Sequence, residues 1–219
     1  PAFAKAGLNE VKNSIYQRVS DVVRLGGSNS YNDAIKGLNG GVDLDGSNIS
    51  YYIGCKILEE LLVMGKVGVF VDMPSLTGLT RKDEIGKRPY LYYYKREDIR
   101  NWRLNPQDPS QFEAILLKDY GYIEEDGFPT GIKTTYRHLW RKDGVVHARI
   151  YDDEGTIIEQ FKLNIPRIPF ALFEISESLM TDIADYQIAL LNMSSSDINY
   201  ALKANYPFYT EQRDTRYEN

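Results

Sequence analysis

The sequence contains two histidines, His138 and His147, and histidine is the residue type most often used to bind metals in proteins. They flank an Asp143-Gly144 pair, which is a strong signal for a type I′ hairpin turn. A two-residue turn places His147 opposite Trp140, so both imidazoles lie on one sheet face, at diagonal positions. A zinc or iron site would need a further ligand from elsewhere in the chain. Packing of the two histidines among aromatic side chains is therefore the favoured interpretation.

Other patterns that could bind a ligand or attack a substrate are incomplete. Gly65-Lys66 lacks the following Ser or Thr of a phosphate-binding loop. The acidic stretch 43–46 resembles part of a calcium loop, but the first and last positions of that loop would be Gly41 and Tyr52, where carboxylates are required. Three serines at 194–196 lie in a helical pattern without a nucleophile elbow. We predict no catalytic residue, no metal and no cofactor.

Composition limits the classes of function. With 26 basic and 31 acidic residues the net charge is −5, which argues against a protein that grips nucleic-acid phosphates. The single cysteine, Cys55, excludes an internal disulfide and suits a reducing cytoplasm. No apolar run approaches the roughly 20 residues of a membrane span. The start at Pro1 and the polar end predict that the chain is part of a longer polypeptide.

Three segments show helical spacing of apolar residues. The first, 8–25, is predicted to end at Gly26-Gly27, and 28–46 is predicted as a loop or short helix. The second, 47–64, has Ser47 at the expected N-cap and Gly65 at the expected C-cap. The third is a long helix over 179–204, with Ile183, Tyr186, Leu190 and Met193 on one side, stopped by the sequence at 205–207.

Strand patterns fill the region between the second and third helices. The predicted strands are 67–72, 89–94, 112–120, 134–141, 145–151, 157–163 and 170–175, with a turn at 96–99, an extended segment near Trp102 and a loop at 77–87. This predicts an α+β fold in which an antiparallel β-meander is flanked by helices and followed by a long C-terminal helix. The predicted domains are 1–64, 65–176 and 177–219.

The hairpin at 143–144 predicts which side chains share a face. Pairing of Lys142 with Val145 puts a core face on one side and an aromatic face on the other. The core face is predicted to hold Leu139, Val146, Ala148 and Ile150. The opposite face is predicted to hold Tyr136, His138, Trp140, His147 and Tyr151.

Tyrosine is unusually frequent, at 17 of 219 residues, and four of them cluster at Tyr90, Tyr92, Tyr93 and Tyr94. Tyrosine combines a large apolar area with a polar tip and is enriched at protein interfaces. Successive strand residues alternate between the two faces of a sheet, so the four rings are not expected to point the same way. Two interpretations stay open: a subunit interface, at which alanine at Tyr92 or Tyr94 would weaken assembly more than folding, or an ordinary strand with one solvent face.

Five sequence blocks occur in an order that is found in one known family. They lie at 42–47, at 61–74, at 88–91 followed by 99–103, at 168–170, and at 179–187. Together they resemble portal proteins of tailed bacteriophages, although Lys66 stands where that family favours Arg. The motif positions are Asp45, Gly46, Gly65, Gly68, Asp72, Pro74, Pro89, Trp102, Pro169, Asp182 and Asp185.

The resemblance implies a structural role without catalysis. Portal subunits form a homo-oligomeric ring of about twelve copies at one capsid vertex, and double-stranded DNA passes through the ring without sequence-specific binding. The ring is the channel for genome packaging and ejection and the point of tail attachment, or head-tail connector. The implied partners are the major capsid protein, the terminase and the head-tail adaptor. This chain would be the wing region of a virion protein assembled in the host cytoplasm, with the stem beyond its end.

Two alternatives remain open at the level of sequence. The first is another virion adaptor or connector protein, which would also form rings. The second is a metal-dependent enzyme that uses His138 and His147. Measuring bound metal would separate the second from the structural roles, and the length of the full reading frame would separate a portal from an adaptor.

Overall fold

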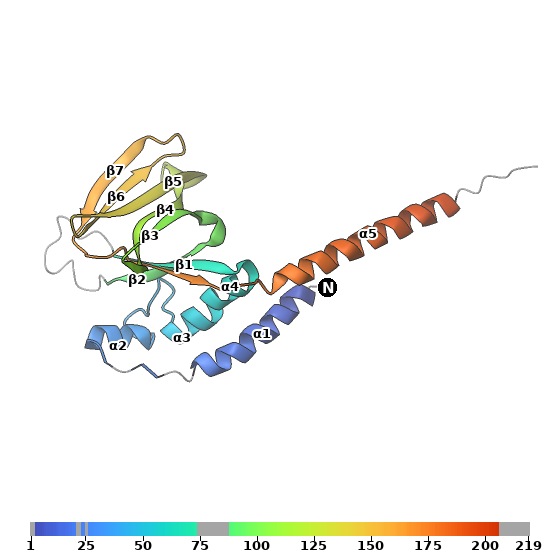
Figure 1. Cartoon of the computed structure of the whole chain (residues 1–219), viewed down its shortest axis with the longest axis horizontal. Coiled ribbons are helices and arrows are strands. Elements are labelled where there is room, and N and C mark those ends of the chain that lie inside the picture. Colours follow the sequence, from blue (N-terminus) through green and yellow to red (C-terminus); the bar gives the residue numbers. More distant parts are fainter. Residues whose placement is uncertain (1–2, 21–22, 25, 74–87, 206–219) are drawn as a thin grey trace, which may run out of the picture. The chain divides into compact units, whose positions relative to one another are not determined.

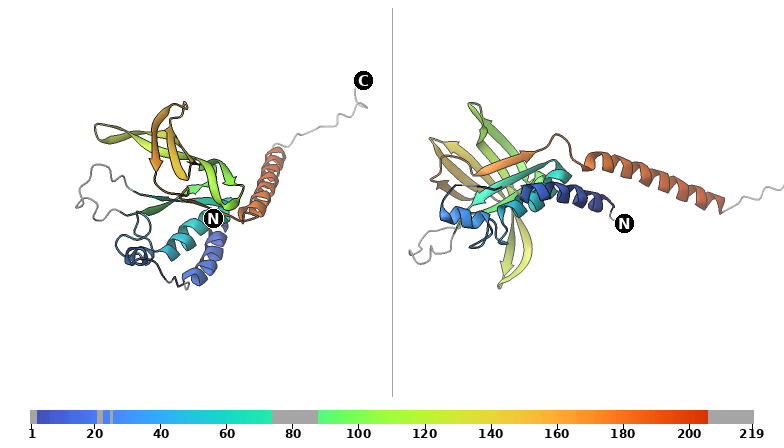
Figure 2. Two further views of the ribbon diagram at one scale, coloured as in Figure 1. Left: turned by 60° about the vertical axis from the view of Figure 1, so that its left-hand side comes forward. Right: turned by 90° about the horizontal axis from the view of Figure 1, so that it is seen from below.

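The computed structural model describes residues 3–20, 23, 24, 26–73 and 88–205. The chain divides into two compact units, Pro1–Leu179 and Met180–Asn219. The first unit has three layers: helices, a three-stranded sheet and a five-stranded sheet (Figures 1 and 2). The predicted regions 1–64 and 65–176 both fall within this first unit. The predicted loop at 77–87 and the motif position Pro74 lie outside the described residues.

The helical layer precedes the sheets in the chain. It consists of α1 (Phe3–Ser20), α2 (Asn29–Ile35), α3 (Ile49–Tyr51), a π-helical segment η1 (Tyr52–Ile57) and α4 (Leu58–Met64). The predicted end of the first helix at residue 25 is wrong, because Val23 and Arg24 are not helical. The segment predicted as a loop or short helix does contain a short helix, α2, and Ser28 caps it by accepting a hydrogen bond from the Tyr31 amide.

The second predicted helix is confirmed, with its end at Met64 as predicted, but it starts at Ile49 and its interior differs from the prediction. Asn48, not Ser47, is the N-cap, and its side chain accepts a hydrogen bond from the Tyr51 amide at 2.7 Å. The Ser47 amide is already engaged, because it donates to the Asp43 carboxylate. The segment η1 is wound as a π-helix, a local variant of helical hydrogen bonding. Gly65 ends the helix at φ 72°, which is the predicted left-handed C-cap.

The three-stranded sheet forms the middle layer. Its strands are β1 (Lys66–Asp72), β2 (Tyr90–Lys95) and β8 (Phe170–Glu174), in the antiparallel order β2-β1-β8. One face packs on the helices through Val67 and Val69, which share a core with Tyr52 and Ile57. The other face packs on the five-stranded sheet. Helices and a second sheet thus cover both sides of β1.

The five-stranded sheet forms the outer layer. A 3₁₀ turn, η2 (Arg96–Asp98), leads into β3 (Ile99–Asn105), β4 (Asp108–Glu125), β5 (Phe128–Lys142), β6 (Val145–Tyr151) and β7 (Ile157–Leu163), which pair in sequence order as an antiparallel meander. Its inner face contributes to the larger hydrophobic core. The buried members of that core are Phe70, Tyr94, Ile99, Phe112, Ile115, Leu117, Leu139, Val146, Ala148, Ile168 and Phe170.

The predicted hairpin between β5 and β6 is confirmed. Asp143 and Gly144 have φ values of 54° and 76°, as a type I′ turn requires. Trp140 pairs with His147, and Lys142 pairs with Val145. The predicted core residues Leu139, Val146 and Ala148 are buried, whereas Ile150 is half-buried.

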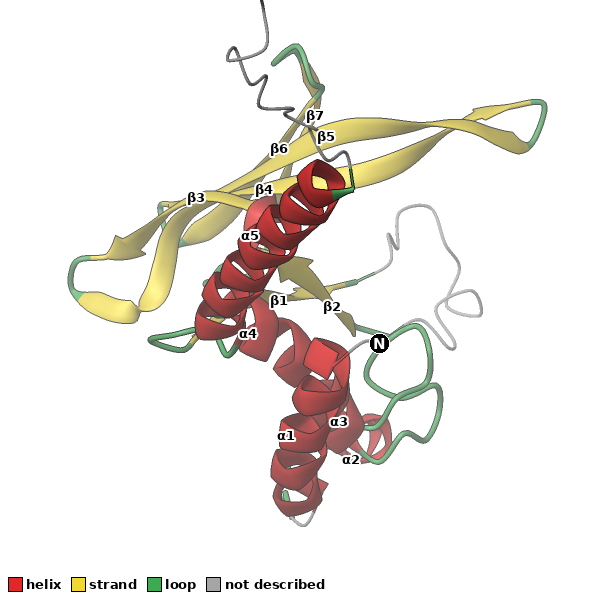
Figure 3. Cartoon of the chain, turned by 90° about the vertical axis from the view of Figure 1, so that its right-hand side faces the viewer, coloured by secondary structure: helices red, strands yellow, loops and turns green. Residues whose placement is uncertain are grey.

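The strands β4 and β5 are much longer than predicted. The predicted strands were 112–120 and 134–141, but the ladder continues through Gly121, Pro129 and Gly131 to a turn at Asp126-Gly127. The φ values there are 53° and 81°, so this is a second tight turn with positive φ at both residues. Figure 3 shows the β4–β5 hairpin running on beyond the other strands of its sheet.

The second unit contains α5 (Met180–Ala204), a helix of 25 residues in which no residue is buried. The observed fold is therefore α+β, with an antiparallel meander and a long C-terminal helix, as predicted. Asn205 follows the helix, and the rest of the predicted stop lies outside the described residues. No helix in the described part of the chain is long and apolar enough to cross a membrane.

Candidate functional site

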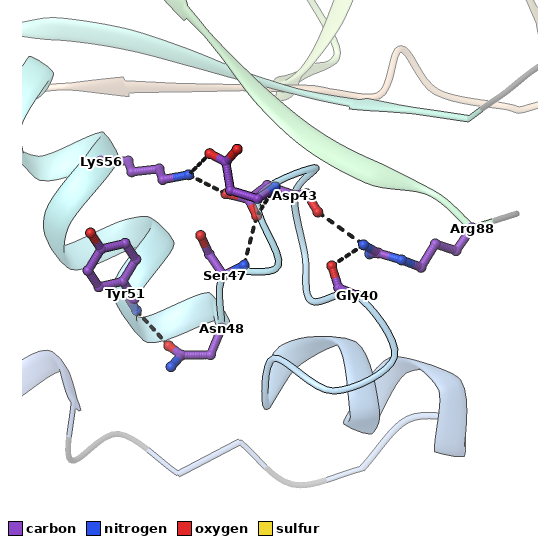
Figure 4. Close-up of polar contacts among 8 residues, drawn as sticks. Gly40, Asp43, Ser47, Asn48, Tyr51, Lys56 and Arg88 are labelled. Carbon is purple, nitrogen blue, oxygen red and sulfur yellow. Dashed lines mark hydrogen bonds and ion pairs between the residues drawn. The ribbon is translucent and has the colours of Figure 1, made fainter. Parts of the chain in front are cut away.

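The first motif block forms a compact loop ahead of the second helix (Figure 4). Asp43 is buried, and one of its carboxylate oxygens accepts backbone hydrogen bonds from Asp45 and Ser47 at 3.1 and 2.8 Å. The other oxygen pairs with Lys56 at 2.6 Å. Lys56 also contacts Asp45 at 2.5 Å, and Gly46 has a φ of 78° within the loop. These contacts fix the conformation of the loop at the start of the second helix.

The same loop covers an edge of the three-stranded sheet. The Val42 carbonyl accepts a hydrogen bond from the Leu91 amide of β2 at 2.7 Å. Arg88, which precedes β2, donates to the carbonyl of Asp43 at 3.0 Å and to the carbonyls of Gly40 and Gly41. The guanidinium therefore satisfies backbone oxygens of the loop that resembled part of a calcium site.

The electrostatics of Asp43 follow from this loop. Burial raises the pKa of the carboxyl, but hydrogen bonds from Lys56 and Ser47 outweigh burial, so the net pKa is lower than its ordinary value. Asp43 remains ionised at neutral pH and balances Lys56. The arrangement is an internal ion pair, whose strength depends on being shielded from water.

The second block positions two glycines and an aspartate. Gly65 is the helix C-cap described above. Gly68 lies on β1 where a Cβ atom would stand 2.1 Å from the Phe170 ring, so no larger residue fits without displacing the core. Asp72 ends β1 and carries a carboxylate that is half-buried between the two sheets. All three glycine and aspartate positions are therefore explained by packing within this chain.

Asp72 belongs to a polar network that joins the sheets. Arg137, on the outer sheet, pairs with Asp72 at 3.2 Å and with Asp119 at 3.0 Å. Arg137 also donates to the Tyr92 hydroxyl at 2.8 Å, and the Tyr94 hydroxyl donates to Asp119 at 2.5 Å. Sequence reasoning did not identify Arg137 or Asp119, because neither lies in a recognisable motif and the contacts join residues far apart in the chain.

The tyrosine cluster at 90–94 lies inside the fold. Tyr94 is 5% exposed and Tyr92 packs against the same core, with burial raising the pKa of both hydroxyls. Tyr93 packs on the helical side, and the ring of Tyr90 lies 6.0 Å from that of Tyr92. The interpretation of β2 as an ordinary strand with one solvent face is wrong, because the helices cover one side of β2 and the five-stranded sheet covers the other. The same burial counts against Tyr92 and Tyr94 as interface residues.

The remaining motif positions lie at separate places. Pro89 directly precedes β2, and the Pro169 carbonyl accepts a hydrogen bond from the Val71 amide at 2.9 Å. Trp102 is 37% exposed on β3 and carries the Lys66 ammonium 4.7 Å from its ring centroid. Asp182 and Asp185 are exposed in the early turns of α5. The motif positions therefore do not converge on one pocket.

The two histidines stack on one tryptophan. The ring centroids of His138 and His147 lie 4.9 and 5.3 Å from that of Trp140, and the Arg149 guanidinium lies 5.0 Å from the same ring. Burial and the charge of Arg149 lower the pKa of His138. Among the described residues no group of three His, Cys, Asp or Glu side chains could hold a metal ion.

The aromatic face bears two adjacent grooves. The larger, of about 710 Å³, includes Tyr136, His138, Trp140, Tyr151 and Asp153 among its lining residues. The smaller, of about 480 Å³, is lined by His138, Trp140, Lys142, His147, Arg149, Gln160 and Lys162. We call the smaller one the basic groove, because three of its seven lining residues are Lys or Arg. The aromatic face predicted from the hairpin register is thus present and half-buried.

The outer part of the β4–β5 hairpin carries several exposed apolar side chains. We call residues 121–133 the arm. Pairing with β3 ends at Leu117 and pairing with β6 ends at Tyr136, so the arm is a two-stranded ribbon within the described structure. Four apolar side chains on it are largely exposed. They are Tyr122 at 74%, Ile123 at 44%, Phe128 at 72% and Ile132 at 69%.

The helix α5 is likewise exposed. Nine large apolar side chains on it are exposed, more than the single stripe that the sequence predicted. On a helix with 3.6 residues per turn, these positions occupy more than half of the circumference. They are Ile183, Tyr186, Ile188, Leu190, Leu191, Met193, Ile198, Tyr200 and Leu202.

Comparison with known proteins gives no family assignment. No family model matches the sequence, and no curated protein matches it significantly.

Proposed function

We propose that this chain is a subunit of a phage portal ring, in which identical copies surround a channel for DNA packaging and ejection and provide the point of tail attachment. The support from sequence is the order of the five blocks. The support from the fold is that the first two blocks have packing roles: the loop at Asp43 closes the helix entry, Gly68 admits the Phe170 ring, and Asp72 joins the sheets.

The observation that carries the proposal is the exposure of α5. A helix that is apolar over more than half of its circumference is typical of an element surrounded by protein. Yet none of the 25 residues of α5 is buried in the single chain. Exposed apolar area on this scale marks an interaction surface. Helices of neighbouring copies, packed side by side around a channel, would cover it.

The charge of the chain agrees with a conduit for DNA. A net charge of −5 does not favour counterion-release binding, so a channel built from such subunits would not hold DNA in transit. The surfaces described above, two grooves and an arm, offer contacts to other proteins. In this proposal the ring has about twelve subunits and meets the major capsid protein, the terminase and the head-tail adaptor in the virion.

The proposal is tested by imaging the purified chain with negative stain over a range of concentrations, together with its mass distribution in solution. Closed rings with a central hole are expected. A chain that remains monomeric at the highest concentration, with a cooperative unfolding transition that shows it is folded, would contradict the proposal.

A further inference from the structure

We propose that the arm of one copy binds in the basic groove of the next copy, and that this contact is a lateral interface of the ring. The inference rests on the proposed function, because it requires identical copies side by side. It assigns a partner to two surfaces that the single chain leaves open: residues 121–133, and the groove around Trp140.

The arm has the properties of a segment that is stable when bound. A two-stranded ribbon alone is marginal in water, because it has no third strand and no packed face. Tyr122 and Ile132 pair across the ribbon and project on the same face, yet they are 74% and 69% exposed. Both outer edges of the ribbon lack a neighbouring strand within the described structure. Such a ribbon gains stability when its apolar face is covered.

The charges of the two surfaces are complementary. The end of the arm carries Glu124 and Asp126, both exposed, whereas the groove carries Lys142, Arg149 and Lys162. Within the described residues, no ion-pair partner is found for Glu124, Asp126, Lys142 or Lys162. Arg149 donates a hydrogen bond to Gln160 and lies against the Trp140 ring. An acidic, aromatic arm thus matches a basic, aromatic groove, and such complementarity both guides association and fixes its register.

The geometry excludes contact within one chain. The arm tip and the groove lie at opposite ends of β5, which has 15 residues and spans about 50 Å at about 3.3 Å per residue. The two ends of one continuous strand cannot meet, so the groove that receives an arm belongs to another copy. Because the two surfaces differ, the contact is head-to-tail. Its repetition closes a ring when the rotation between copies returns to the first copy, and gives an open filament when it does not.

The contact can be tested by charge reversal in two chains. The arm variant carries Glu124→Lys with Asp126→Lys, and the groove variant carries Lys142→Glu with Lys162→Glu. Each alone is expected to associate about 100-fold more weakly than the wild type, because like charges then face each other at every junction. A control with Glu154→Lys and Glu159→Lys makes the same change in net charge as the arm variant, but on β7 and the turn before it, and should associate as the wild type does.

Mixing gives the decisive result. In an equimolar mixture, each reversed arm meets a reversed groove and each native arm meets a native groove, so the two variants should assemble together in alternation. All four substitutions in one chain should also restore association. Thermal unfolding confirms that each variant is folded.

The outcomes separate this contact from the proposed function. The contact is wrong if the wild type and both variants associate equally well. It is also wrong if the wild type associates but the two folded variants fail to assemble when mixed. Neither result contradicts the proposed ring. If the wild type itself never associates, the proposed function and the contact both fail.

Discussion

Two aromatic strand segments of this chain have opposite surroundings. In β2, Tyr92 and Tyr94 lie in the core between two sheets. In the arm, Tyr122 and Phe128 are more than 70% exposed. Both segments are aromatic and both belong to antiparallel pairs. The difference lies in what covers them, because β2 has a layer on each side and a loop along its edge, whereas the arm extends beyond every neighbouring strand.

This comparison explains which predictions succeed. Hydrophobic period and turn chemistry are local properties, so the hairpin at Asp143-Gly144 and the helix C-cap at Gly65 could be predicted from the sequence. Coverage of a strand face is set by distant segments. The tyrosines of β2 were therefore assigned to an interface or to solvent, although the helices and the outer sheet enclose them.

The candidate site was predictable in part for the same reason. The register placed His138, Trp140 and His147 on one face correctly, since it follows from a two-residue turn. The arm was missed because the predicted strands stop at residue 120 and resume at residue 134, although Asp126-Gly127 is a turn signal that could have identified it. The Arg137 network had no local signal, because its partners lie 18 to 65 positions away.

The sharpest contrast between the two segments comes from one pair of substitutions. Tyr94→Ala removes a buried ring and should lower the free energy of unfolding by about 3–5 kcal/mol. Tyr122→Ala removes an exposed ring and should change it by no more than about 0.5 kcal/mol, while weakening self-association. Urea unfolding and sedimentation velocity measure the two effects. Equal losses of stability would show that the arm is packed within its own chain.

A second test breaks the connection between the sheets. Arg137→Met leaves the half-buried carboxylates of Asp72 and Asp119 without their cation, and should destabilise the fold by about 1–3 kcal/mol. Lys133→Met lies on the same strand but on the arm, where the side chain is exposed, and serves as the matched control. Denaturant unfolding at pH 7 compares them. Similar midpoints for the two variants would contradict a structural role for the network.

Glycines provide a third comparison of the two regions. Gly68→Ala forces a methyl group against the Phe170 ring and should cost about 1–3 kcal/mol. Gly121→Ala on the arm meets no atom within 4 Å and should be neutral or slightly stabilising. The difference between the two melting temperatures is the measured quantity. A harmless Gly68→Ala would mean that the core at β1 is looser than the structure indicates.

The last comparison is a pH-dependent one and concerns the loop that covers the edge of β2. The pKa of Asp43 is lower in the folded state than in the unfolded state, so the ionised carboxylate stabilises the fold. This stabilisation is fully present when the pH is above the unfolded-state pKa, and it is lost as the pH falls through the folded-state pKa. Asp43→Asn should therefore cost about 1–3 kcal/mol near pH 7, with the difference from wild type shrinking below about pH 4. Denaturant unfolding from pH 7 to pH 2 measures this. A gap that stays constant with pH would contradict the ionic contribution.

The most direct test of assembly through the arm is a disulfide cross-link between copies. On a Cys55→Ser background, a chain with both Asp126→Cys and Lys142→Cys should form, on oxidation, a ladder of covalent oligomers ending at the closed ring. Either single-cysteine chain should stop at dimers. The intended bond cannot form within one chain, because Asp126 lies in the turn before β5 and Lys142 lies at the far end of that strand. A double-cysteine chain that assembles like the wild type but yields no ladder beyond dimers would contradict the account.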